Sequence, residues 1–183
     1  AFSVERIGKS GVKFDIDKAK WFNEQYLRAK TNTELVEYLK VDLAKQNIAF
    51  EESKLESIVE LMKERAVFPK DMFNQGRFIF IAPTYYDEKV ISKKWNDQVA
   101  DALAKYNTEL ANLSVYNADN IKQLFFDVLE ANGMKMGQVM QSLRVAITGE
   151  GAGPDLMMMM EIIGKEEATK RIETALTTIK VEA

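Results

Sequence analysis

The chain has no cysteine and no histidine among its 183 residues. Without cysteine it can form no disulfide, no thiolate nucleophile and no cysteine-based zinc site. Without histidine it lacks the commonest general base, which removes most hydrolase and metalloenzyme schemes. A carboxylate mechanism stays formally open, but acidic residues on helical surfaces mostly serve as solvated partners of basic ones. We therefore expect no catalytic residue and no metal site in this chain.

Long apolar runs and an excess of positive charge are also missing. No stretch approaches the length of a membrane span, and the N-terminus does not have the pattern of a signal peptide. The net charge of −3 argues against indiscriminate binding of DNA or other nucleic acids. The first 30 residues nevertheless contain seven basic and four acidic side chains, so positive charge is distributed unevenly. Because patterned sequence begins at once and the first residue is Ala1, we expect a piece of a longer protein.

What the sequence does have is helical periodicity from end to end. Apolar residues recur at helical spacing in segments 15–30, 31–47, 53–66, 87–113, 117–132, 137–147, 154–164 and 165–179. Thr31 with Glu34, and Ser53 with Glu56, stand at the spacing of a capping box and predict two helix starts. Pro154 stands where the first helical position of its segment is expected.

Segment 67–88 breaks the helical pattern and predicts a connector with short turns. It contains Pro69, Pro83 and a dense set of aromatic side chains: Phe68, Phe73, Phe78, Phe80, Tyr85 and Tyr86. The one stretch with strand-like alternation, residues 77–81, is too short to matter. We predict an all-α fold of two consecutive small helical bundles, residues 1–85 and 86–183.

The segment "SLRVAITGEGAGPDL", residues 142–156, places three of the nine glycines after an arginine, Arg144. A Walker-type phosphate loop needs a preceding strand and a Lys-Ser/Thr pair, whereas here a helix precedes and Asp155 would repel phosphate. A dinucleotide-binding fingerprint would need a third glycine at another spacing and a βαβ unit. From the residues alone, the segment is a connector between two helices, with an arginine beside exposed backbone.

Two further clusters allow a binding interpretation and a packing interpretation. Four consecutive methionines, residues 157–160, could form an adaptable surface, but four in a row cover every face of a helix, so at least two are expected in the core. Residues 63–86 combine the aromatic set with basic side chains, a combination that suits unstacked RNA bases. Aromatic residues at a junction between bundles are usually core, so composition alone favours packing. The basic members are Lys63, Arg65, Lys70 and Arg77.

Two segments of the chain follow longer residue patterns. The first is "FSVERIGKSGVKFDIDKAKWFNEQYLR", residues 2–28, which follows FxxERV…S…VFDxxKLxWxNxxYIR. The second is "GMKMGQVMQSLRVAITG…GPDLMMMMEIIGKEEATKRIETAL", residues 133–176, which follows GxKxGxxxxPLRxALTG…xPGLFExLxLLGKExxxxRLxxAL. With these patterns the chain resembles the bacterial glutamyl-tRNA synthetases, in which the first pattern enters the anticodon-binding region and the second ends it. The resemblance extends over nearly the whole chain in order, and the middle, residues 30–130, matches least.

The resemblance implies class I ligases that join glutamate to tRNA(Glu) with ATP and Mg²⁺. In this family a catalytic nucleotide-binding fold with a histidine-containing signature precedes the matched region. We therefore expect an anticodon-binding part that is inactive alone and needs no cofactor itself, cut from a cytoplasmic, monomeric ligase that does not bind membranes. The alternative is a helical protein-interaction module whose resemblance no longer serves tRNA.

The resemblance also implies which residues meet the anticodon. The helix "ELMKER" ends on Arg65, which corresponds to the family's reader of the third anticodon base and favours the glutamate anticodon over the glutamine one. The positions that hold the first anticodon base in the family fall on Arg144, Gly153, Pro154 and Leu156.

Two residues in this region depart from the family pattern, and two basic residues are assigned from charge alone. Ser142 replaces a proline and Asp155 replaces a glycine, and Asp155 could repel backbone phosphate. Lys9 and Lys13 are expected to touch the tRNA backbone, on the basis of charge only.

Overall fold

The computed structural model describes residues 15–180, and every regular element within them is a helix. This confirms the predicted all-α class. The N-terminal elements are α1 (Ile16–Ala29), α2 (Asn32–Lys45), η2 (Glu52–Lys54), α3 (Leu55–Lys63), α4 (Asp71–Gln75) and α5 (Arg77–Phe80). The C-terminal elements are α6 (Glu88–Lys94), α7 (Asp97–Ala111), α8 (Ala118–Ala131), α9 (Met136–Thr148), α10 (Leu156–Ile163) and α11 (Lys165–Thr178). None of the described helices is long and apolar enough to cross a membrane.

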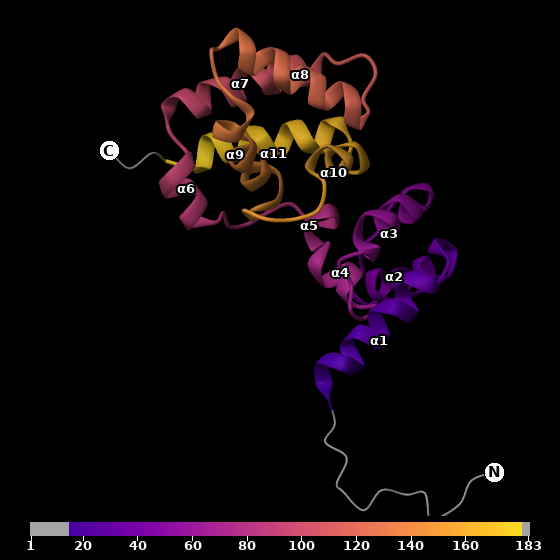
Figure 1. Ribbon diagram of the computed structural model, residues 1–183. Helices are drawn as coiled ribbons and strands as arrows, with labels where there is room; N and C mark the ends of the chain where they lie inside the picture. Colours follow the sequence, from indigo (N-terminus) through magenta and orange to yellow (C-terminus); the bar gives the residue numbers. More distant parts are fainter. Residues whose placement is uncertain (1–14, 181–183) are drawn as a thin grey trace, which may run out of the picture.

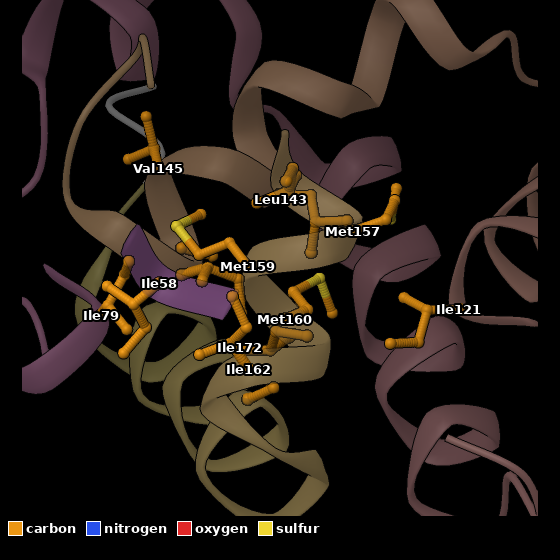
Figure 2. Packing of buried hydrophobic residues seen from close by; sticks show 14 of the residues in the cluster. Ile58, Ile79, Ile121, Leu143, Val145, Met157, Met159, Met160, Ile162 and Ile172 are labelled. Carbon is orange, nitrogen blue, oxygen red and sulfur yellow. The ribbon is translucent and has the colours of Figure 1, made fainter. Parts of the chain in front are cut away.

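The helices form two groups in space, α1 to α4 and α6 to α11, with α5 where the groups meet (Figure 1). A single cluster of buried side chains nevertheless runs through both groups. At their junction α10 contacts both α3 and α5, and Figure 2 shows Ile58 of α3 and Ile79 of α5 near Met159 of α10. The division of the chain near residue 85 therefore stays a prediction, since the groups share one core.

The capping box expected at the start of α2 is confirmed. The backbone N–H of Thr31 donates to Glu34 Oε2 at 2.8 Å, and the N–H of Glu34 donates to Thr31 Oγ1 at 3.2 Å. The pair satisfies two backbone donors that the first turn of a helix leaves without partners. Both bonds are local, so their sequence spacing was enough to predict them.

The second expected capping box, at the start of α3, is wrong. Ser53 lies within the 3-10 turn η2, and its hydroxyl donates to Glu51 Oε1 at 2.6 Å. Glu56 instead accepts a hydrogen bond from Thr33 Oγ1 at 2.9 Å. Because Thr33 lies on α2, a contact between two helices replaced the local bond that the spacing predicted.

The prediction of one long helix over 87–113 is also wrong, because the helical path is interrupted at Trp95 and Asn96, between α6 and α7. Trp95 has an extended backbone and a buried side chain, and Asn96 accepts from the N–H of Val99 at 3.0 Å as the N-cap of α7. Ser142 is fully buried and donates through Oγ to the carbonyl of Lys94, the last residue of α6, at 3.2 Å. The serine that departs from the family pattern thus joins α9 to the end of α6.

The start of α10 differs from the expectation by two residues. Pro154 lies outside the helix, and Asp155 is its N-cap, with Oδ1 accepting from the N–H groups of Met157 and Met158 at 2.9 Å each. An aspartate is among the best N-caps because it satisfies orphan donors of the first turn. Of the four methionines only Met158 is exposed, which confirms that at least two lie in the core.

Candidate functional site

A cleft of about 690 Å³ lies between the connector and the glycine loop. Its walls combine side chains from the end of α3, from α5 and its flanking turns, and from the loop between α9 and α10. Volumes of roughly 300–1,000 Å³ are typical of sites that hold small molecules or parts of larger ones. The residues that matter below are Arg65, Arg77, Tyr85, Glu150, Gly153 and Pro154.

Arg65 reaches this cleft from just beyond the last turn of α3. Its backbone N–H donates to the carbonyl of Met62 at 3.0 Å, which continues the helical path for one more residue. The side chain is exposed, and within residues 15–180 its guanidinium makes no hydrogen bond or ion pair. An arginine without an internal partner keeps all its donors available to a ligand.

Arg144 lies behind the wall of the cleft rather than on it. It is half-buried on α9, and its Nη1 donates to the carbonyl of Pro154 at 2.8 Å. Burial lowers the pKa of Arg144, the carboxylate of Asp155 acts against that shift, and the positive charge of Arg65 adds to it. Arginine still carries its charge at neutral pH. The charge of Arg65 reaches Arg144, so the two arginines lie near each other although they are 79 positions apart in sequence.

The glycines of the loop permit a close approach to the connector. Gly149 has a left-handed backbone, with φ of 81°, and a Cβ there would lie 2.5 Å from the carbonyl oxygen of Tyr85. The carbonyl of Gly149 accepts from the N–H of Asp87 at 2.8 Å. A Cβ on Gly151 would lie 2.5 Å from Val90 Cγ2. Gly149 is therefore explained by its left-handed backbone and its close contact with the connector, and Gly151 by its packing against the side chain of Val90 on α6.

Gly153 is the glycine of this loop that borders the cleft. A Cβ on it would lie 3.0 Å from Arg144 Nη1 and 3.8 Å from Phe78 Cζ. The neighbouring Pro154 also lines the cleft, but Leu156 is only 3% exposed and belongs to the core. The structure thus brings Arg65, Gly153 and Pro154 to one cleft, with Arg144 behind it.

Leu156, in contrast, has no surface to offer a ligand in this conformation. Lys9 and Lys13 lie outside the described residues.

A contact across the cleft was not predictable from the sequence. The hydroxyl of Tyr85 donates to Glu150 Oε1 at 2.8 Å, and this bond raises the pKa of Tyr85. The two residues are 65 positions apart, and neither belongs to a motif that signals the other. Within residues 15–180, no group of three or more Asp or Glu side chains is placed to hold a metal ion.

Comparison with known proteins then decides the family. The family model described as the anticodon binding domain matches residues 24–176. The chain belongs to the anticodon-binding domain family. This anticodon-binding domain includes both walls of the cleft, since the match begins within α1 and ends within α11.

Relatives of this anticodon-binding domain are glutamate–tRNA ligases. The chain is 48% identical over 180 residues to the glutamate–tRNA ligase of Cytophaga hutchinsonii, and 49% identical over 179 residues to that of Amoebophilus asiaticus. Each match covers 98% of this chain and 35% of the relative. A solved glutamate tRNA ligase from Elizabethkingia meningosepticum superposes with a TM-score of 0.90 at 40% identity, over 98% of this chain and 36% of that one. The chain thus spans about a third of the length of these relatives.

Proposed function

We propose that the chain is the anticodon-binding part of a glutamate–tRNA ligase and reads the anticodon of tRNA(Glu) in the cleft. The observation that carries this proposal is the convergence of Arg65 with Gly153 and Pro154, which the resemblance assigned separately to the third and first anticodon bases. A protein that reads the first and third bases of one three-base anticodon needs both sets of contacts on one surface, and a single cleft provides that surface.

The chemistry of the cleft suits an RNA loop. A guanidinium can hydrogen-bond the edge of a base through two N–H groups, provided that the base is unstacked and turned outward. Arg65 is placed for that role, because its side chain is exposed and lines the cleft. One N–H donor of Arg144 is already occupied by the carbonyl of Pro154. We therefore assign Arg144 first to positioning Pro154 and second to contact with the base.

Exposed arginines favour this proposal over a module that binds another protein through an apolar helix. They give the cleft a positive character in a chain whose net charge is −3. We place the ligase reaction, with its ATP and Mg²⁺, in the part of the longer protein that this chain does not span. By itself the chain is expected to bind tRNA without forming glutamyl-tRNA, and the longer protein is expected in the cytoplasm as a monomer.

The test compares binding to transcripts of tRNA(Glu) that carry either the glutamate or the glutamine anticodon. For Arg65→Ala we expect the preference for the glutamate anticodon to fall by about 1–3 kcal/mol, since one base loses its edge contacts. Lys122→Ala, on α8, is the control, because no residue of α8 lines the cleft and α8 lies across the C-terminal group from α5 (Figure 1). The site assignment is wrong if neither Arg65→Ala nor Arg144→Ala alters binding.

A further inference from the structure

Tyr85 is a second candidate for contact with RNA in the same cleft, and the resemblance gave it no role. Although Tyr85 is aromatic, it is 64% exposed. The hydroxyl is held by Glu150 at 2.8 Å, and the backbone carbonyl of Tyr85 abuts Gly149. The hydrogen bond to Glu150 therefore holds the hydroxyl end of the ring, the contact with Gly149 places the backbone of Tyr85, and most of the side chain faces solvent. A fixed, exposed aromatic ring in a cleft is a platform for a flat partner.

Arg77 lines the same cleft and also lacks a partner of its own. It is exposed on α5, and among the described residues its guanidinium forms no ion pair within 4.0 Å and no hydrogen bond. Its charge reaches Tyr85, because it opposes the rise in the pKa of Tyr85 that the bond to Glu150 causes. A cation beside an aromatic platform matches the two parts of a nucleotide, the phosphate and the base.

We propose that Arg77 and Tyr85 form a nucleotide subsite, in which the ring of Tyr85 stacks on an unstacked base of the anticodon loop and Arg77 pairs with a neighbouring phosphate. The inference rests on the proposed function. The carboxylate of Glu150, at the hydroxyl end of the ring, repels phosphate and so leaves the phosphate on the side of Arg77.

This subsite differs in kind from the contact made by Arg65. Every base has a flat face, so stacking adds affinity without distinguishing sequences, and a phosphate contact does the same. Tyr85 and Arg77 therefore set how tightly the loop is held, whereas Arg65 sets which anticodon is preferred. The two roles separate experimentally. Loss of Tyr85 or Arg77 should weaken the affinity for every anticodon, whereas loss of Arg65 should change the ratio of the affinities for the glutamate and glutamine anticodons.

The experiment measures the Kd of the 183-residue chain for tRNA(Glu) transcripts with glutamate and glutamine anticodons over a range of salt concentrations. For Tyr85→Leu we expect roughly tenfold weaker binding to both transcripts. Tyr85→Phe keeps the ring and loses only the hydrogen bond to Glu150, so it should bind both transcripts more tightly than Tyr85→Leu does. Arg77→Gln should weaken binding to both and reduce the slope of log Kd against log salt by about 0.7–0.9. Lys122→Gln, the matched control on α8, should change neither quantity.

The possible failures point to different conclusions. If the unaltered chain binds neither transcript, both the proposed function and this subsite are overturned. If it binds and Arg65→Ala loses the preference, but Tyr85→Leu and Arg77→Gln behave like Lys122→Gln, only the subsite is overturned. Equal losses for Tyr85→Phe and Tyr85→Leu would assign the effect to the bond with Glu150 and overturn stacking.

A second measurement does not depend on the folding of Tyr85→Leu. Transcripts carry 2-aminopurine at each anticodon-loop position in turn, and its fluorescence is recorded with the unaltered chain and with Tyr85→Phe. We expect quenching at one position with both proteins, because the ring is present in both. Quenching at no position overturns the proposal.

Discussion

Arg171 is the residue whose role most exceeds what its sequence position suggests. Only 3% of it is exposed, on α11. Its Nη1 donates to the carbonyl of Ile147 at 3.1 Å and to that of Phe78, while Nε pairs with Glu167 at 2.8 Å. One guanidinium thus ties α11 to the last turn of α9 and to α5, and Phe78 of α5 is itself part of the lining of the cleft.

We predict that Arg171→Ala lowers the free energy of unfolding by about 3–5 kcal/mol. The change leaves the buried carbonyl of Ile147 and the partly buried carbonyl of Phe78 without this donor, and it removes the partner of Glu167. Urea unfolding followed by circular dichroism measures the loss, and Lys170→Ala, an exposed neighbour on the same helix, is the control. A loss of less than about 1 kcal/mol would show that water replaces the guanidinium at these carbonyls.

At the scale of elements, local signals predicted helix ends well where the partners lay within a few residues. Thr31 and Glu34 behaved as their spacing predicted, and so did the overall order of helices. The prediction failed at Ser53, and again at the break near Trp95, because side chains from other helices supplied the competing contacts. Glu56 accepts a hydrogen bond from Thr33 of α2 instead of capping its own helix, and the burial of Trp95 favoured two helices over one. Such contacts have no signature in a single sequence.

The capping box of α2 leads to a prediction about pH. Hydrogen bonds from the backbone and side chain of Thr31, and then the bond and charge of Lys30, lower the pKa of Glu34 below 4.5. A carboxylate whose pKa is lowered by folding stabilises the fold above its unfolded pKa, and that contribution is lost as the pH falls through the folded value. We therefore expect Glu34→Gln to unfold at a lower temperature than the unaltered chain at pH 7.

The gap between the two melting temperatures should close below the folded pKa of Glu34. Thermal unfolding between pH 7 and about pH 3 measures it. Asp101→Asn, which changes an exposed carboxylate on α7, is the matched control. A gap that stays constant with pH would mean that the shape of the side chain, and not its charge, stabilises the helix start.

At the scale of the whole molecule, the two helical groups share one core, and this decides how the chain should unfold. Ile58 of α3 and Met159 of α10 are fully buried where the groups meet. We predict a single cooperative transition for both groups. Trp21 on α1 and Trp95 between α6 and α7 report one group each. In Trp95→Phe only Trp21 reports, and in Trp21→Phe only Trp95 reports. The two urea curves should share a midpoint after each is corrected for the change in the free energy of unfolding that its own substitution causes.

A substitution at Met159, in the contact between the two groups, tests the same prediction from the core. Met159→Ala is expected to cost about 2–5 kcal/mol, since it opens a cavity among side chains of both groups. Both tryptophan signals should then shift together. Two separate transitions, or a shift in the signal of Trp95 alone, would instead support independent bundles on either side of residue 85.

The cleft is also a property of the whole molecule, which is why only part of it could be predicted. Sequence comparison with a family named Arg65 and the glycine loop but gave no reason for them to meet. The hydrogen bond between Tyr85 and Glu150, and the exposure of Arg77, depend on how the connector folds against the loop. Leu156 was assigned to the ligand and lies in the core, because a pattern does not distinguish a residue that supports a turn from one that touches a partner.

The fit of Gly149 against the backbone of the connector has a consequence for the kinetics of the proposed recognition. A loop held in place by a close backbone contact has lost its conformational entropy during folding, before any RNA arrives. In the complex that we propose, the ordering that remains on binding falls on the RNA loop, whose bases must leave their stack. The stiffness of the RNA, rather than any motion of the protein loop, would then limit how fast the proposed complex forms.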